Sequence, residues 1–289
     1  MPTCGRVTHF NETSRNLYWR YTAKVRPPSL RDHLSMAVKR SLMPGVQVTP
    51  GYAWNEIVLA TRSPDARSQI RSLLELLSRS VTIEDDADCS HALGVHTLFN
   101  PDVEDTSGAK TYIGEVASDA KYTGHVWSAG QLADLMADFV DSHPLYSQAS
   151  RITCPPSSND GFNTSGLAYR MAQRVSNLLG LPFVSMSGSQ REARKNKRRI
   201  NDCSDVIGTF EVTDHVSGDT VLVVDDLYGH GCTINEATRA LRVSRCKRVL
   251  ALSGSKDASG CQGLPPHIDK WPNWVPAESR KPAGDLPFK

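Results

Sequence analysis

The first hundred residues show two spacings of apolar residues. Between Leu17 and Val25 every second residue is apolar, which predicts a strand with one buried face. Two later stretches have apolar residues at helical spacing, and Ser29 and Ser63 stand where these helices would begin. The predicted elements are a strand at 17–25, a helix at 29–42, a hairpin with strands at 46–49 and 56–61, a helix at 63–77 and a strand at 94–99. This is the order of the split βαβ pattern, so residues 1–100 are predicted to form a small α+β domain with ferredoxin-like connectivity.

The rest of the chain alternates apolar strands with amphipathic helices. Residues 101–110 are polar and rich in helix and strand breakers, which predicts a linker. The elements predicted after it are helices at 128–140 and 167–179 and strands near 151–154, 183–186, 209–212, 220–224 and 248–252. This order predicts an α/β domain over residues 111–254, with a parallel sheet and helices on both of its faces. Residues 255–289 are rich in proline and are predicted to form an extended tail.

The stretch after residue 220 carries the clearest chemistry. Four apolar residues, 221–224, predict a strand buried on both faces, and Asp225 and Asp226 follow at its carboxyl end, where parallel sheets bind ligands. The glycine-containing loop 228–233 then leads into a helix, whose first N–H groups suit a phosphate. Carboxylates accept hydrogen bonds from hydroxyl groups or hold a hard cation through water. The combination predicts a site for a sugar phosphate.

Other phosphate-binding motifs do not fit this stretch. No Lys-Ser or Lys-Thr pair follows the glycines, which excludes a Walker loop, and the third glycine of a dinucleotide fingerprint is missing. A receiver domain also begins with an apolar strand and paired acids. Such a domain needs roughly a hundred further residues, and only 64 follow Asp225. A strand-turn-helix whose acids only cap the helix is the simplest structural alternative.

The order of these residues resembles the signature with which type I phosphoribosyltransferases bind 5-phosphoribosyl 1-diphosphate (PRPP). Further motifs in residues 111–254 resemble the ComF-like branch of that superfamily: Ala120-Lys-Tyr-Thr-Gly124, Pro155-Pro156, Gly161-Phe-Asn163 and Gly208-Thr-Phe210. The resemblance implies that Asp225 and Asp226 are catalytic carboxylates that face the ribose hydroxyls. It also implies that the 5′-phosphate is bound by Tyr228, Gly229, His230, Gly231, Cys232 and Thr233, and that pyrophosphate lies beside Cys154, Pro155, Pro156 and Ser157. Mg²⁺ is expected to bind together with PRPP, and no metal ligand is assigned directly.

Two parts of the chain depart from the family pattern. Gly229 and His230 stand where hydroxyl residues usually precede the central glycine, and Asp160 stands where an arginine is expected just before Gly161. These replacements remove donors to phosphate. The resemblance therefore favours PRPP binding over turnover.

Charge and cysteine content constrain the partners and the compartment. The chain has 289 residues and a net charge of +2, which alone does not indicate nucleic-acid binding. A basic run within residues 191–199 is interpreted as a solvated loop, an anion-binding flap or a nucleic-acid contact; the flap residues are Arg194, Lys195, Lys197, Arg198 and Arg199. Seven scattered cysteines without a C-x-x-C pair predict reduced, structural thiols. No apolar run reaches membrane-spanning length and no signal peptide is recognised, so a cytoplasmic protein without membrane contact is predicted.

Three functions are compatible with these features. The leading hypothesis is a PRPP-binding, phosphoribosyltransferase-like enzyme that moves a phosphoribosyl group to an unidentified nitrogenous acceptor and releases pyrophosphate. The alternatives are a non-catalytic ComF-like module that binds a nucleotide or DNA, and a regulator that senses PRPP. The N-terminal domain is expected to select a partner or substrate, or to form an oligomer.

Overall fold

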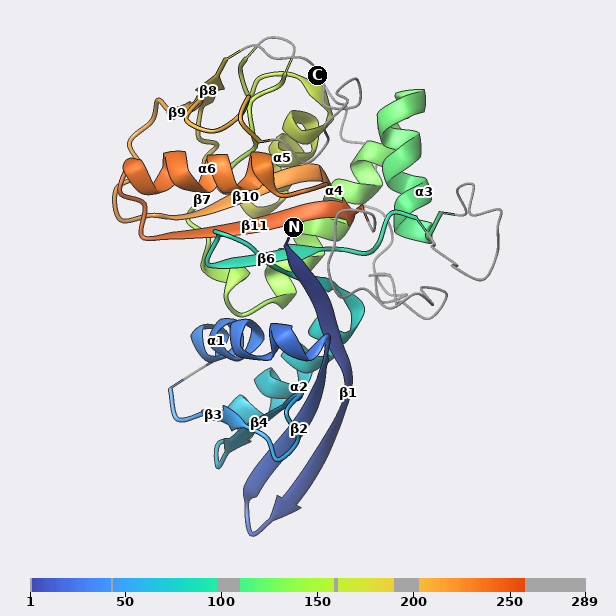
Figure 1. Ribbon diagram of the computed structural model, residues 1–289, viewed down its shortest axis with the longest axis vertical. Helices are drawn as coiled ribbons and strands as arrows, with labels where there is room; N and C mark the ends of the chain where they lie inside the picture. Colours follow the sequence, from blue (N-terminus) through green and yellow to red (C-terminus); the bar gives the residue numbers. More distant parts are fainter. Residues whose placement is uncertain (1, 43, 98–109, 159–160, 190–202, 258–289) are drawn as a thin grey trace.

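A computed structural model describes residues 2–42, 44–97, 110–158, 161–189 and 203–257. One mixed sheet of nine strands runs through the molecule in the order β3-β4-β2-β1-β5-β6-β11-β10-β7 (Figure 1). Its N-terminal strands are antiparallel and lie in the lower half of this view, whereas the C-terminal strands are parallel and lie in the upper half. A separate two-stranded sheet is formed by β8 and β9.

The antiparallel half follows the predicted pattern closely. Its elements are β1 (Thr3–Arg15), β2 (Tyr18–Arg26), α1 (Arg31–Ser41), β3 (Gln47–Pro50), β4 (Glu56–Thr61), α2 (Pro64–Arg79) and β5 (Val81–Glu84). The alternating apolar residues of β2 are buried and join the core cluster that contains the apolar residues of α1 and α2. Ser63 caps α2 by accepting a hydrogen bond from the N–H of Ala66, and Pro64 occupies the first turn. The predicted strand, hairpin and two helices are confirmed.

The first strand and the last strand of this half differ from the expectation. No strand was predicted before residue 17, because the register of β1 shifts between Val7 and His9 and breaks its alternation. β1 is inserted between β2 and β5; without it, the strands have the order of the ferredoxin-like pattern, but β5 runs parallel to β2, where that pattern has the two strands antiparallel. Of the strand predicted at 94–99, the described residues form only isolated bridges, Val95 with Lys256 and Thr97 with Lys110, and residues 98–99 lie outside the described ranges. Residues 81–83 are buried directly after α2, so the chain re-enters the sheet earlier, as β5 and then β6 (Cys89–Ala92).

The C-terminal half is a parallel sheet with helices on both faces, as predicted. Its strands are β6, β11 (Arg248–Lys256), β10 (Thr220–Tyr228) and β7 (Arg151–Thr153). The helices α4 (Val126–Ser142) and α5 (Gly166–Leu179) pack on one face, and α6 (Cys232–Val243) packs on the other (Figure 1). Of the strand predicted near 183–186, Phe183 joins this sheet through a parallel bridge with Ile152 of β7. The strand predicted at 209–212 is present as β9 (Phe210–Val212), but it pairs with β8 (Met186–Gly188) and packs on the α6 side instead of joining the sheet.

The connection into α4 shapes one end of the parallel strands. The short helix α3 (Tyr112–Ser118) begins at Thr111, whose hydroxyl accepts a hydrogen bond from the N–H of Gly114. A π-helical turn, Asp119–Thr123, continues α3 and ends at Gly124 in the left-handed conformation. None of the helices in the described ranges is both long and apolar enough to cross a membrane.

The two halves meet at β6. This strand pairs antiparallel with β5 on one side and parallel with β11 on the other. The buried hydroxyl of Tyr146 lies 3.0 Å from the carbonyl oxygen of Cys89 and 2.7 Å from that of Ala251, and its single proton, shared between these two acceptors, ties the two strands together. One sheet therefore continues through both predicted segments. The linker at 101–110 stays a prediction, because residues 101–109 lie outside the described ranges, as does most of the predicted tail 255–289.

Candidate functional site

The acid pair lies at the carboxyl edge of the parallel strands. Asp225 is opposite Ser253 of β11, and Val223, two residues earlier, is opposite Thr153 at the end of β7. The turn after β7 and the loop after β10 therefore leave the sheet at the same edge, which is where α/β sheets bind ligands. The structure brings together the acids, the loop 228–233 and the turn 154–157.

Asp225 and Asp226 have different surroundings. The Asp226 carboxylate forms an ion pair with Lys121 of the π-helical turn, with 2.7 Å between Oδ2 and Nζ. Asp225 Oδ1 accepts a hydrogen bond from the N–H of Asp226 at 2.9 Å. Burial raises the pKa of the Asp225 carboxyl, and the Asp226 carboxylate raises it further, while Lys121 opposes both effects. Burial by itself lowers the pKa of Lys121, but the two carboxylates hold this pKa above its ordinary value.

The loop after β10 presents the start of α6 to this edge. Gly231 has a φ of 87°, in the left-handed region that favours glycine, and it directly precedes the helix. Among the described residues no side chain caps this helix start, so its first N–H groups are left for another acceptor. Cys232 is buried, whereas Gly229, His230 and Thr233 are partly exposed. The geometry suits an anion.

A buried lysine supports the same loop from beneath. Lys256, at the end of β11, is fully buried, and its Nζ donates to the carbonyl of Gly229 at 2.9 Å. The ammonium group lies 5.4 Å from the centre of the Tyr228 ring. Burial lowers the pKa of Lys256 to about 8, and Asp257 opposes this shift. Its positive charge adds to that of the helix start and favours an anion at the loop.

Tyr228 also acts from beneath the loop. Its side chain is 1% exposed, and its hydroxyl donates to Asp85 Oδ2 at 2.9 Å. A Cβ atom at Gly231 would lie 2.6 Å from this hydroxyl, so the loop can pass over the ring only with glycine there. Burial raises the pKa of Asp85 to about 6, and its hydrogen bonds from Ser90 and Tyr228 oppose the shift. The Tyr228 side chain therefore positions the loop and does not face its open side.

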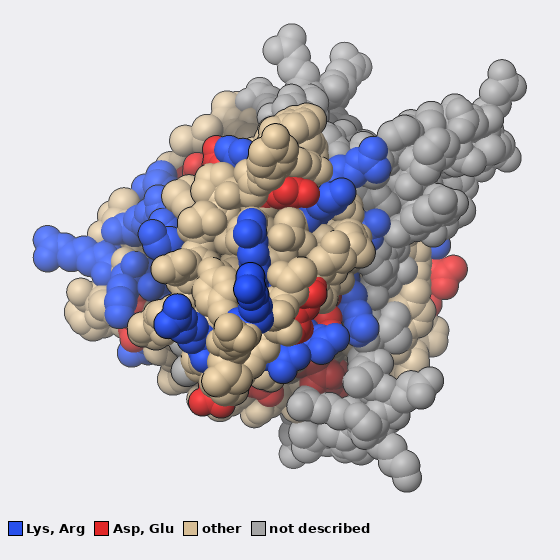
Figure 2. Space-filling model, turned by 90° about the horizontal axis from the view of Figure 1, so that it is seen from below, with Lys and Arg blue, Asp and Glu red and all other residues tan. Residues whose placement is uncertain are grey.

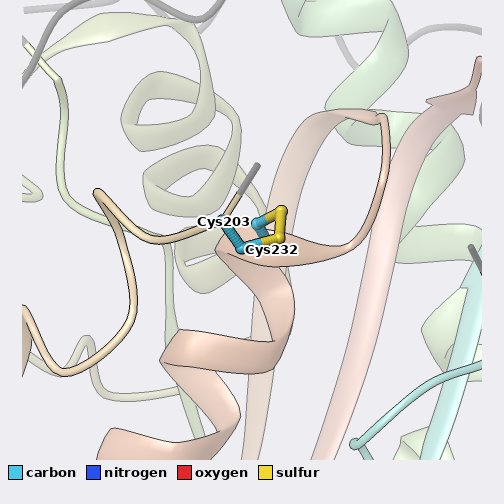
Figure 3. The surroundings of a disulfide bond; sticks show 2 residues. All are labelled: Cys203 and Cys232. Atoms are coloured by element: carbon cyan, nitrogen blue, oxygen red, sulfur yellow. A yellow bond between two sulfur atoms is a disulfide. The ribbon is translucent and has the colours of Figure 1, made fainter. Parts of the chain in front are cut away.

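The prediction of reduced thiols is wrong for Cys4, Cys203 and Cys232, which are disulfide-bonded. Cys203 and Cys232 form a disulfide, with their Cα atoms 5.4 Å apart (Figure 3). The two residues are 29 positions apart and belong to no motif, so only the fold reveals that Cys203 meets the first residue of α6. The free cysteines among the described residues are Cys89, Cys154 and Cys246. The disulfide ties the loop to the segment that follows the basic run.

The turn 154–157 lies beside the acids but offers few donors. Its first three residues are buried, and two of them are prolines, which have no N–H. The N–H of Ser157 donates to the carbonyl of Phe162 at 2.8 Å. Burial raises the pKa of the Cys154 thiol, and the charge of nearby Asp225 raises it further. The turn therefore shapes the edge of the site more than it supplies hydrogen-bond donors.

The predicted flap lies outside the described residues. This applies to Arg194, Lys195, Lys197, Arg198 and Arg199, and also to Asp160. Three other charged residues of the site were not recognised in the sequence: Lys121, Lys256 and Asp85. Lys121 belongs to the motif 120–124 that carried the family resemblance, so a signal for it existed. Asp85 had none, because only the pairing of β5 and β6 with the parallel strands brings it under the loop.

A second cluster, in the core, contains metal-ligating atoms. The ligand atoms of Cys89, His91 and His143 lie within 4.8 Å of one another. Nδ1 of His143 accepts a hydrogen bond from the N–H of Leu145 at 3.1 Å, and Nε2 of His91 is 3.2 Å from the hydroxyl of Thr82. Burial lowers the pKa of His143 to about 3 and that of His91 well below its ordinary value. We assign this cluster to the hydrogen-bonded core, because its ring nitrogens already have protein partners.

Comparison with known proteins gives matches among solved structures. No family model and no curated protein sequence matches this chain. A hypoxanthine phosphoribosyltransferase from Staphylococcus aureus is 9% identical with a TM-score of 0.28, and the match covers 45% of this chain and 66% of that one, just under two thirds. An adenine phosphoribosyltransferase from Leishmania tarentolae is 10% identical with a TM-score of 0.32, covering 61% and 96%. These neighbours are type I phosphoribosyltransferases, at low identity and partial coverage. Similarity this low does not indicate an activity. The ComF-like branch remains a prediction.

Proposed function

We propose that this chain binds PRPP at the carboxyl edge of its parallel strands and transfers the phosphoribosyl group to a nitrogenous acceptor, with release of pyrophosphate. The observation that carries the proposal is that one chain segment holds two carboxylates and an uncapped helix start. Carboxylates accept hydrogen bonds from the hydroxyls of a sugar, and a helix start binds a phosphate. A ribose 5-phosphate group presents both on one small molecule.

The charges of the site match those of the bond that would break. In the transfer, the bond from ribose C1 to the pyrophosphate oxygen breaks, its electron pair leaves with pyrophosphate, and the acceptor nitrogen bonds to C1. Positive charge grows on the sugar ring during this step, as in glycoside hydrolysis. Asp225 and Asp226 would hold the ribose hydroxyls and stabilise this charge. Lys121, which pairs with Asp226, would stabilise the negative charge of the leaving group.

Magnesium fits this site together with the ligand. Carboxylate oxygens suit Mg²⁺, but Lys121 engages Oδ2 of Asp226 and a backbone N–H engages Oδ1 of Asp225. The remaining oxygens of the two acids would hold the ion directly or through water. When bound, Mg²⁺ would neutralise pyrophosphate. We therefore expect weak binding of Mg²⁺ without PRPP.

Isothermal titration calorimetry tests the binding step. PRPP with Mg²⁺ is titrated into the wild type, into the variant Asp225→Asn/Asp226→Asn, and into the control Asp65→Asn/Glu75→Gln, which loses the same charge on α2. The wild type and the control should bind alike, and the acid-pair variant should bind at least about a hundredfold more weakly, because two hydrogen-bonded charges are lost. Equal binding by all three proteins, or no heat in the wild type, would contradict the proposal.

A non-catalytic module that binds a nucleotide or DNA, or a sensor of PRPP, is the second candidate. Gly229 and His230 favour it, because they lack the hydroxyls that the family usually offers to phosphate. Binding of PRPP without pyrophosphate release, measured with each common nucleobase as acceptor, would support it. If the basic run binds DNA, replacing Lys195, Lys197, Arg198 and Arg199 by Ala should weaken binding and reduce its salt dependence.

A further inference from the structure

Positive charge is concentrated in the N-terminal half of the sheet. Residues 1–80 contain twelve Lys and Arg residues and five Asp and Glu residues, a net charge of +7, whereas the whole chain has a net charge of +2. The rest of the chain is therefore negatively charged overall. Seen from the end where the N-terminal strands lie, basic side chains (blue) clearly outnumber acidic ones (red) (Figure 2). Such an asymmetry indicates a polyanionic partner for one half of the molecule.

Four of these twelve cations lie on one face of the antiparallel strands, which we call the open face. It consists of the exposed residues His9, Asn11, Thr13 and Arg15 of β1 and Tyr18, Arg20, Lys24 and Arg26 of β2. The opposite face of β2 is buried in the core with α1 and α2. Register places Arg15 opposite Tyr18, and Arg20 opposite Thr13. The cations of β2 therefore lie in one row along the strand, with Lys24 four residues after Arg20 and Arg26 two residues after Lys24.

The cations of the open face have no ion-pair partner among the residues that the structure describes. Across the described ranges, no carboxylate lies within ion-pair distance of Arg15, Arg20, Lys24 or Arg26. On the neighbouring strand β4, Ala60 lies opposite Arg20, and Glu56 lies opposite Lys24. By contrast, the α2 cation Arg67 on the helix side is held by Glu12 at 2.7 Å. A row of unpaired like charges is unfavourable for the isolated fold and is relieved when an anion binds.

Exposed aromatic residues accompany these cations at both ends of the row. Tyr18 is 38% exposed and lines a cavity of about 570 Å³ with Gln47 and Arg62. At the other end, Tyr52 and Trp54 are fully and largely exposed on the β3–β4 loop. A hydrogen bond holds this loop beside the end of β2: the N–H of Val25 donates to the carbonyl of Asn55 at 2.9 Å. Aromatic rings interspersed with cations are what unpaired bases and phosphates require.

We propose that the open face binds single-stranded nucleic acid. Arg15, Arg20, Lys24 and Arg26 contact phosphates along the strand of nucleic acid, and bases stack on Tyr18 at one end and on Trp54 at the other. A single strand fits better than a duplex, because a duplex keeps its base faces stacked and offers none to the aromatic rings. This surface is distinct from the PRPP site, which lies at the carboxyl edge of the parallel strands.

The test measures binding of fluorescently labelled oligomers to the full chain. The probes are oligothymidylate and oligouridylate of about 20 nucleotides and a DNA duplex of the same length, at several salt concentrations. The variant Arg20→Gln/Lys24→Gln removes two cations of the open face. Arg71→Gln/Arg79→Gln is the matched control, since it removes two exposed cations from α2. Tyr18→Ala tests stacking.

The wild type should bind a single strand more tightly than the duplex. Arg20→Gln/Lys24→Gln should weaken this binding about tenfold and reduce the slope of log affinity against log salt by about 1.4, whereas the α2 control should bind as the wild type does. Tyr18→Ala should weaken binding about tenfold without changing that slope. A preference for either the thymidylate or the uridylate oligomer over the duplex supports the proposal. Absence of binding, tighter duplex binding, or equal losses in the two double variants would overturn it.

Discussion

The antiparallel half of the sheet is covered on one face, whereas the parallel half is covered on both. Along β2, buried and exposed residues alternate, but the first five residues of β10 are all buried. A strand buried on both faces can present functional groups only at its ends, and that is where Asp225 and Asp226 lie. A strand buried on one face can present them along its length, as Arg20 and Lys24 do. The same sheet thus offers an edge site in one half and a face site in the other.

The largest expected effect compares the same substitution in the two halves. Leu222 is fully buried in β10, so Leu222→Ala should lower the free energy of unfolding by about 4 kcal/mol through lost burial and a cavity. Leu17 is 74% exposed at the β1–β2 turn, so Leu17→Ala should change stability by less than about 0.5 kcal/mol. Urea unfolding followed by circular dichroism measures both. Similar losses in the two variants would contradict the burial of Leu222 and the exposure of Leu17.

The second prediction concerns the disulfide, which lies in the parallel half. Cys203→Ser/Cys232→Ser should lower the free energy of unfolding by about 3 kcal/mol, because the bond closes a loop of 29 residues in the unfolded chain. As the control, the wild type and the variant are both measured in reductant, where their stabilities should match, because Cys4 is also disulfide-bonded and is reduced in both proteins. Hydrogen exchange in the variant then compares the two halves of the sheet. Protection of the β2 amides should fall as much as that of the β10 amides only if the sheet unfolds as one unit. Unchanged stability in the variant would rule out a stabilising disulfide.

The sequence predicted local elements better than long-range contacts. The alternation in β2, the cap at Ser63 and the apolar strand before Asp225 each depend on neighbouring residues, and all three are present in the structure. β1 was missed because a register shift breaks its alternation. The disulfide could not be predicted, since Cys203 and Cys232 meet only after α6 packs on the sheet.

The same distinction applies to the candidate site. The acids and the glycine loop are consecutive in the sequence, so their chemistry could be inferred from one stretch. Lys121 reaches Asp226 from a π-helical turn, and Asp85 reaches Tyr228 from the N-terminal half. These contacts depend on the order of strands in the sheet, which residue periodicity does not determine. Electrostatic partners were therefore the part of the site that required the structure.

The third prediction uses the raised pKa of Asp225. Burial and the Asp226 carboxylate raise this pKa, so folding favours the protonated form of Asp225. The free energy of unfolding is therefore not reduced by Asp225 near pH 4, the ordinary carboxyl pKa. It falls as the pH rises through the raised pKa, because Asp225 ionises more readily in the unfolded chain than in the folded protein. Asp225→Asn cannot ionise and should be more stable than the wild type near pH 9, by about 1–2 kcal/mol, with a smaller difference near pH 4.

Thermal unfolding across this pH range measures the effect, with Asp65→Asn on exposed α2 as the control. The control should follow the wild type at every pH. Replacing a cation of the open face by a neutral residue should give no comparable gain in stability, because these side chains are exposed to water. A constant difference between Asp225→Asn and the wild type at all pH values would show that the Asp225 pKa is not raised in the folded protein.

The smallest expected effect concerns Lys121, which brings positive charge to the acidic edge. Lys121→Gln leaves both carboxylates without their ammonium partner, so affinity for PRPP should fall about twofold to fivefold, and binding should depend more steeply on Mg²⁺. The effect is modest because the Lys121 side chain is 38% exposed and screened by water. Lys121→Arg should restore the affinity, whereas Lys247→Gln, at the far end of β11, should have no effect on it. If Lys121→Gln instead weakens oligonucleotide binding as much as it weakens PRPP binding, the edge site and the open face are not independent.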